Sequence, residues 1–142
     1  LFPVYHNMRL LNYFAEYSAA FVTDLYGNAF SGRVDPSDPF GSLANRYLSF
    51  FMRAASWGKA ELYKKRAKQY HVDGIVFHSN RCCRNFTAEQ PDIGAILRDE
   101  LGLPSMSFEG NMVDPRGYDD AGVKAKIESF IEMLEAKKYP KK

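Results

Sequence analysis

Both cysteines of the chain stand side by side, in the stretch HSNRCC at residues 78–83. Neighbouring cysteines close too small a ring for an unstrained disulfide, so a structural crosslink is a poor explanation for them. Three uses remain: small residues packed under a loop, a thiol redox pair, or a thiolate ligand of a metal centre. A CC pair alone is not a metal motif, and its spacing leaves these three uses open.

The cysteines follow residues 75–77, a β-branched and apolar run that predicts a strand. Residues 19–23 and 104–108 have similar composition and predict two more strands. Apolar side chains at helical spacing predict five helices, at residues 3–17, 43–51, 59–70, 87–101 and from about 119 to 134. Strands that alternate with helices favour an α/β fold: a small doubly wound parallel sheet in the three-layer α/β/α arrangement of Rossmann-like and flavodoxin-like domains.

Loops that follow the strands of such a sheet lie along one edge, where ligands bind. The predicted strands would therefore bring Asp24, His78 and Glu109 toward the cysteines, and these three are the candidate catalytic residues. Each also has a structural explanation: turn formation for Asp24, a hydrogen-bonded loop position for His78, and an exposed strand end for Glu109. The sequence assigns proton transfer to none of them.

Composition narrows the class of protein. The chain has 142 residues, 46% of them apolar, which is enough for one compact domain. Its net charge is +2, and its basic residues are scattered apart from short clusters, so we expect no nucleic-acid partner. No apolar run approaches the ~20 residues that cross a bilayer, and the start lacks a secretory layout, so we expect a cytoplasmic protein without a membrane partner. Common nucleotide-binding and hydrolase motifs (GxxxxGK, GxGxxG, HExxH and GxSxG) are absent.

Several stretches of the chain share the pattern of one family. They are VTDLYG (22–27), LANRYL (43–48), DGIVFHSNRCC (73–83), LGLP (101–104), FEGNMVDPR (108–116) and KIESFIEML (126–134). They resemble the 2-hydroxyacyl-CoA dehydratase and benzoyl-CoA reductase family, most specifically in the His-Ser-Asn-Arg-x-Cys loop. The resemblance, together with leucine at position one, implies that residues 1–142 are the C-terminal α/β domain of a subunit of the 2-hydroxyglutaryl-CoA dehydratase D-component type, cut from a longer chain.

The resemblance also implies a 4Fe–4S cluster shared between two α/β domains. The cysteine that the later domain contributes falls on Cys83, while Cys82 stands where the family commonly has serine and is the less favoured ligand. Arg81 and Asn80 would adjust the cluster's potential through charge and hydrogen bonding. The other ligands would come from cysteines outside this chain, so we expect the isolated polypeptide to be inactive and to bind no stable cluster. The chain departs from the family at Asn111, where aspartate is frequent, and at Arg84, where lysine is frequent.

The activity implied by the resemblance is elimination of water from a 2-hydroxyacyl-CoA by a heterodimer. Its partners would be a homologous second subunit, an ATP-dependent iron–sulfur activator protein and the acyl-CoA substrate. One-electron reduction of the thioester carbonyl to a ketyl radical would make loss of the hydroxyl feasible, and the electron would then be recycled. Three alternatives stay open: a benzoyl-CoA reductase-type subunit that reduces an aromatic acyl-CoA, a non-catalytic scaffold or interaction domain, and a thiol switch at Cys82 and Cys83.

Overall fold

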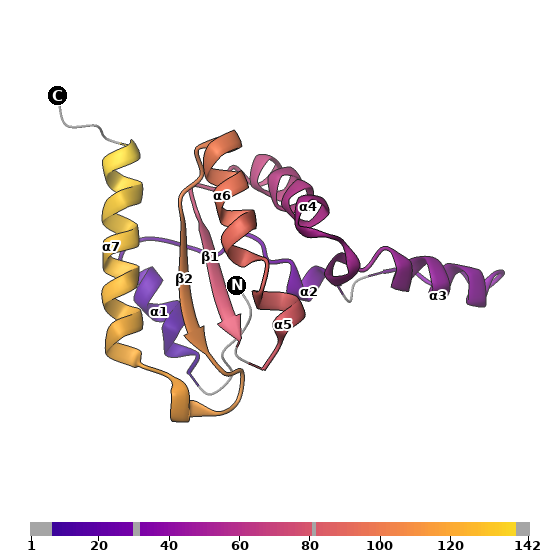
Figure 1. The fold of residues 1–142 in the computed structure, drawn as a ribbon, viewed down its shortest axis with the longest axis horizontal. Coiled ribbons are helices and arrows are strands. Elements are labelled where there is room, and N and C mark those ends of the chain that lie inside the picture. The colour runs from indigo at the N-terminus through magenta and orange to yellow at the C-terminus, as the bar shows by residue number, and fades with distance from the viewer. Residues whose placement is uncertain (1–6, 30–31, 81, 139–142) are drawn as a thin grey trace.

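The computed structural model of the chain describes residues 7–29, 32–80 and 82–138 (Figure 1). Its helices are α1 (Arg9–Ala15), α2 (Tyr26–Ala29), α3 (Pro39–Leu48), α4 (Ser56–Gln69), α5 (Arg84–Thr87), α6 (Gln90–Leu101) and α7 (Asp120–Lys138), with short 3-10 turns η1 (Phe51–Arg53) and η2 (Pro115–Gly117). Its strands are β1 (Ile75–Asn80) and β2 (Ser105–Gly110). No helix in the described ranges combines the length and the apolar character of a bilayer-crossing segment.

The two strands pair in parallel and in register, from Ile75 opposite Ser105 to Asn80 opposite Gly110. The helix α6 connects them, as a parallel pair requires a crossover. The backbone N–H of Ile75 donates to the carbonyl oxygen of Pro104 at 3.0 Å and extends the ladder by one bond. Both strands therefore end at the same edge of the sheet, and the loops that follow them begin side by side.

Helices cover both faces of this sheet (Figure 1). On one face α4 and α6 bury Phe77 of β1 in an apolar cluster with Ala60, Ala67, Ile75, Ile93, Leu97 and Leu103. On the other face α1 and α7 bury Phe108 of β2 with Leu10, Phe14, Met106, Val123, Ile127, Phe130 and Ile131. The alternation of side chains along each strand supplies both clusters. The expected α/β class is thus confirmed, with a sheet of two strands in the described part of the chain.

Both ends of α6 carry residues that are typical of helix termini. Pro91 lies in its first turn, where a missing N–H costs no intrahelical bond. Gly102 ends it with φ 62°, and its N–H donates to the carbonyl oxygen of Arg98 at 2.8 Å. The helix α3 begins at Pro39, earlier than expected, because Asp38 caps it by accepting from the N–H of Gly41 at 3.0 Å.

The prediction of a strand at residues 19–23 is wrong. These residues connect α1 to α2 without joining the sheet, which in the described residues has the order β1-β2. Their apolar composition suits a strand, but a strand forms only against a neighbouring backbone edge. A pocket separates residues 18–26 from β1, so the backbone edge they would need lies out of reach.

Candidate functional site

The carboxyl end of β1 is folded into a tight turn by Asn80, whose side chain is 4% exposed. Its side-chain oxygen accepts from the backbone N–H of Cys82 at 3.2 Å, and its carbonyl oxygen accepts from the N–H of Cys83 at 3.0 Å. A side chain that bonds the backbone two residues on is typical of an Asx turn. Asn80 therefore positions both cysteines through hydrogen bonds to their backbone N–H groups, while its own side chain is buried. Arg81, the other predicted cofactor-tuning residue, lies outside the described residues.

Cys83 is held at the start of α5. Its carbonyl oxygen accepts from the N–H of Phe86 at 3.1 Å, from the N–H of Thr87 at 3.2 Å and from the Thr87 hydroxyl at 3.0 Å. Its thiol is free and its side chain half-buried. These bonds fix the backbone of Cys83, so its sulfur leaves the loop from a defined point.

Cys82 contacts the loop that follows the other strand. Cys82 forms no disulfide, and its side chain is exposed. The side-chain amide of Asn111 donates to its sulfur at 3.1 Å. Asn111 also accepts from the N–H of Val113 at 3.1 Å, which shapes its own loop. The expected meeting of the two strand-end loops is therefore present, with Cys82 and Asn111 as the pair that touches.

His78 is part of the core. Its side chain is 1% exposed, and its ring stacks on Phe108 with centroids 5.0 Å apart. Its Nε2–H donates to the carbonyl oxygen of Gly110 at 3.1 Å, while its own carbonyl oxygen accepts from the side chain of Gln90 at 2.9 Å. This candidate catalytic residue thus joins β1 to the end of β2 from inside the fold.

The other two candidates, Asp24 and Glu109, belong to different segments of the chain. Asp24 accepts a hydrogen bond from the N–H of Gly27 and so shapes the start of α2, which is the turn role that its residue type suggested. Glu109 is exposed and lies opposite Ser79 in the register of the sheet. Glu109 is therefore exposed near the carboxyl edge, Asp24 is partly exposed and lines the same pocket as His78, and His78 is buried.

Sequence reasoning missed Lys59, which lies under the cysteine loop. Its side chain is almost fully buried, yet its ammonium lies 2.7 Å from a carboxylate oxygen of Glu89 and donates to the carbonyl oxygen of Asn85 at 3.2 Å. Asn85 belongs to α5, two residues after Cys83. Lys59 precedes Tyr63 and Ala67 at four-residue steps, so helical spacing could have indicated that it faces the core.

Tyr118 packs against the carboxyl end of β2 at Gly110. A Cβ at Gly110 would come within 3.2 Å of its ring, so any larger residue at this position would require the tyrosine to shift by a few tenths of an ångström. Burial, aided by the negative charge of Asp120, raises the pKa of Tyr118 to about 12. The phenol is therefore neutral at physiological pH.

The donor set at this edge is consistent with part of a metal site. Iron–sulfur clusters usually take about four cysteine thiolates. In the described ranges, histidine, cysteine, aspartate and glutamate form no group of three that could hold a metal ion. The two thiols that are not in a disulfide, Cys82 and Cys83, would make up at most part of the ligand set of such a cluster.

Comparison with known proteins identifies the family. The profile of the family described as 2-hydroxyglutaryl-CoA dehydratase, D-component, matches residues 1–134. The chain is 32% identical over 117 residues, 82% of its length, to a benzoyl-CoA reductase subunit of Thauera aromatica. It is 28% identical over 95 residues, 67% of its length, to the alpha subunit of lactoyl-CoA dehydratase of Anaerotignum propionicum. These matches cover 27% and 22% of the relatives, so the chain spans about a quarter of their length. The chain belongs to the 2-hydroxyglutaryl-CoA dehydratase D-component family.

Proposed function

We propose that the chain is the C-terminal, cysteine-bearing domain of an iron–sulfur 2-hydroxyacyl-CoA dehydratase subunit. One observation carries the proposal: in a chain of this family, the loops after two parallel strands meet at Cys82 and Asn111, with Cys83 fixed beside them. Ligands of α/β sheets bind at this edge. The cysteines are therefore where a shared cofactor and substrate would lie.

Cys83 is the residue that we propose as the thiolate ligand of a 4Fe–4S cluster. Its backbone is held by bonds from Phe86 and Thr87, so its Cα–Cβ bond would keep its direction when the other ligands approach from outside this chain. Cys82 would lie beside the cluster, with its sulfur already accepting from Asn111. When bound, the cluster would supply single electrons for reduction of the acyl thioester. Hydrogen bonds and charges around cluster sulfurs adjust the potential, and Asn111 and Arg81 are the proposed sources.

The buried residues His78 and Lys59 would position the cysteine loop. His78 joins β1 to Gly110, and Lys59 ties Asn85 of α5 to Glu89, so the two residues support the cysteine loop from opposite sides. Glu109 is the most exposed of the three candidate catalytic residues and is the carboxylate that we propose to face the acyl-CoA. Asp24 would act through the turn that it forms with Gly27.

A homologous second subunit is the proposed partner, because the relatives are themselves named as subunits of their enzymes. The helix α3 projects from the body of the domain (Figure 1) and has no buried residue. Phe40, Tyr47 and Leu48 on it are 86%, 63% and 63% exposed. Large apolar side chains gathered on a protruding helix are typical of a surface that a subunit partner covers. An ATP-dependent iron–sulfur activator would deliver the electrons.

Reduction of an aromatic acyl-CoA is the second candidate, favoured by the 32% identity to the benzoyl-CoA reductase subunit over most of the chain. The deciding assay uses the full-length subunit with its natural partner and activator, under anaerobic conditions, with ATP and a strong reductant. We expect a panel of (R)-2-hydroxyacyl-CoA esters to yield 2-enoyl-CoA products, while benzoyl-CoA stays unchanged. Conversion of benzoyl-CoA alone would replace the dehydratase assignment with the reductase. A complex that carries iron but converts neither class would refute both, and a complex without iron would support the scaffold alternative.

A further inference from the structure

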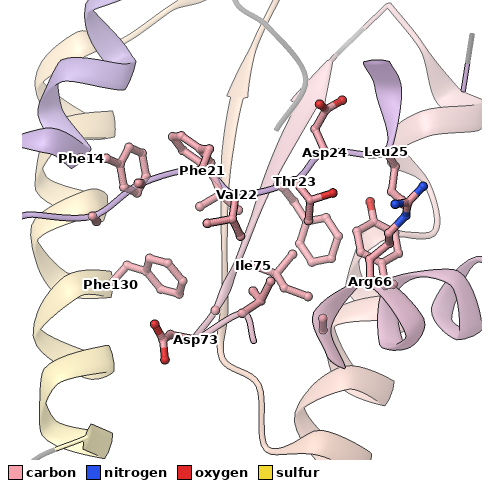
Figure 2. A pocket seen from close by; sticks show the side chains of 18 of the residues that line it. Phe14, Phe21, Val22, Thr23, Asp24, Leu25, Arg66, Asp73, Ile75 and Phe130 are labelled. Carbon is pink, nitrogen blue, oxygen red and sulfur yellow. The ribbon is translucent and has the colours of Figure 1, made fainter. Parts of the chain in front are cut away.

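A pocket of about 330 Å³ lies between residues 18–26 and β1 (Figure 2). Native protein interiors contain few voids larger than one water molecule, which occupies about 30 Å³. Phe21 and Val22, which line this pocket, are 38% and 55% exposed, although both are large and apolar. Large apolar side chains that stay exposed beside a pocket of this size are typical of a surface that another segment of protein covers.

The lining shows that the pocket lies in the plane of the sheet. Residues 71–78 line the pocket without a gap, and so do residues 18–26 opposite them. A pocket on the face of a strand would be lined by every second residue, because successive side chains point to opposite faces. A continuous lining arises when the pocket lies along the backbone edge of the strand.

The backbone of β1 presents hydrogen-bonding groups to this pocket. In a parallel ladder, alternate residues direct their N–H and carbonyl groups to opposite neighbours. The N–H of Ile75 points to Pro104 on the β2 side, so the groups of Val76 point to the pocket side. The carbonyl oxygen of His78, two residues on, agrees with this assignment because it accepts from Gln90, another residue that lines the pocket.

The pocket also lies between two helical layers. Phe130, Ile131 and Leu134 of α7 line it from one side, and Tyr63, Arg66 and Ala67 of α4 line it from the other. In Figure 2, Phe14, Phe21 and Phe130 gather at one end of the pocket, while Leu25 and Arg66 lie at the other. The backbone edge of β1 on one side and helices above and below match the surroundings of a central β-strand in a three-layer fold.

The helix α1 has the course of a helix that connects two parallel strands. Asn7 and Tyr13 donate to the carboxylate of Asp120 at 2.7 Å each, and Tyr17 donates to Glu128 at 3.1 Å, so α1 runs parallel to α7. Since α7 follows β2, both helices begin at the carboxyl edge and run back along the sheet. This is the course of a crossover helix, and a crossover helix follows a strand.

The handedness of the connections agrees with a strand in this place. The helix α6 covers one face as the chain steps from β1 to β2, and α1 covers the opposite face. A connection from a strand in the pocket to residues 19–23 would cross the sheet in the direction opposite to that of β1 to β2. Such a connection is right-handed only if its helix lies on the face that α6 does not cover. The observed place of α1 therefore fits a strand that precedes it in the pocket.

We propose that a parallel β-strand, formed by the polypeptide immediately before Leu1 in the full-length subunit, occupies this pocket and joins β1 to residues 19–23. The sequence Leu1-Phe2-Pro3 contains a proline, which lacks the N–H that a central strand needs, so we assign the strand to the polypeptide before it. With the strand present, residues 19–23 would gain the neighbouring edge that they lack. The strand would be needed whether or not Cys83 binds iron.

The test is hydrogen exchange of the full-length subunit, resolved to single amides by fragmentation in the mass spectrometer. We expect several of the ten residues before Leu1, together with Val76, to exchange at least about a hundredfold more slowly than unstructured chain. Replacing those ten residues with alternating glycine and serine should speed exchange at Val76 about tenfold or more relative to Phe77, whose N–H points to β2.

Exchange of the ten residues at unstructured rates would overturn the proposal, as would a Val76 amide that does not respond to the replacement. A crystal structure of the full-length subunit with residues 19–23 bonded directly to β1 would overturn it too. If the replaced variant does not fold, the pattern in the natural subunit decides, because protection of the ten residues is required in any case.

Discussion

The imidazole of His78 donates a hydrogen bond to the carbonyl oxygen of Gly110 at 3.1 Å, and this bond ties the ends of the two strands together. The ring lies on Phe108 in the same core, so the residue fills space and satisfies a buried carbonyl at once. The loops that carry Cys82 and Asn111 begin directly beyond this tie.

His78→Ala should lower the free energy of unfolding by about 2–4 kcal/mol, because it leaves a cavity and an unbonded carbonyl at Gly110. Urea denaturation of the full-length subunit measures this. The matched control is Lys65→Ala, since Lys65 is exposed on α4 and alanine suits a helix. The control should change stability by less than about 0.5 kcal/mol. Equal effects of the two substitutions would contradict the role given to His78.

Lys59→Met should destabilise the subunit by about 1–3 kcal/mol, because it leaves the carbonyl of Asn85 and the carboxylate of Glu89 without the ammonium. Adding Glu89→Gln should recover part of this loss, since the remaining partner is then neutral. Lys65→Met, at an exposed position of α4, is the control and should be nearly neutral. Urea midpoints of the natural protein, Lys59→Met, Glu89→Gln and the double variant give the coupling energy, and strict additivity of Lys59 and Glu89 would refute the ion pair as a stabilising contact.

Stability should fall as pH rises from about 10 to about 12. Burial raises the pKa of Tyr118 to about 12, whereas a tyrosine in unfolded chain ionises near 10. In that window the unfolded chain loses the proton and the folded chain keeps it, so rising pH favours unfolding. Tyr118→Phe should shrink this fall, and Tyr47→Phe on the exposed face of α3 should not. Urea midpoints between pH 8 and 11.5 measure it, and an unchanged fall in Tyr118→Phe would contradict the expectation.

Tyr47→Asp should weaken association with the partner subunit by about tenfold or more, because an interface would have to desolvate the new charge. Lys68→Asp, an exposed position on α4, is the control for a charge change of the same sign. Sedimentation velocity of the subunit mixed with its partner gives both affinities. If Tyr47→Asp binds as tightly as the control variant, α3 is not the contact surface.

Much of the fold could be predicted because its signals are local. The run at residues 75–77 predicted β1 and the run at 104–108 predicted β2, although β1 continues through Asn80. Polar residues such as Ser79 carry no strand signal, yet the ladder of β2 holds them extended. Residues 19–23 show the converse, since their composition favours a strand but the pairing edge belongs to another segment.

The candidate site was predictable for two of the three loops that were expected to meet, those after β1 and β2. The rule that parallel strands end at one edge brought Cys82 and the loop of Asn111 together, as observed. The rule could not tell that His78 points into the core, because strand alternation places a side chain only once the register is known. Lys59 escaped notice because a buried lysine depends on partners, Glu89 and Asn85, that lie far along the sequence.

The most direct test of the central claim is the iron and acid-labile sulfide content of the full-length subunit purified without oxygen, as the natural protein and as two matched variants. Cys83→Ser should lose most of both elements and the low-temperature paramagnetic signal of the reduced cluster, while Cys82→Ser should keep them with at most a shifted potential. Equal iron and sulfide in Cys83→Ser and the natural protein would contradict the account, and loss in Cys82→Ser alone would transfer the ligand role to the neighbouring cysteine.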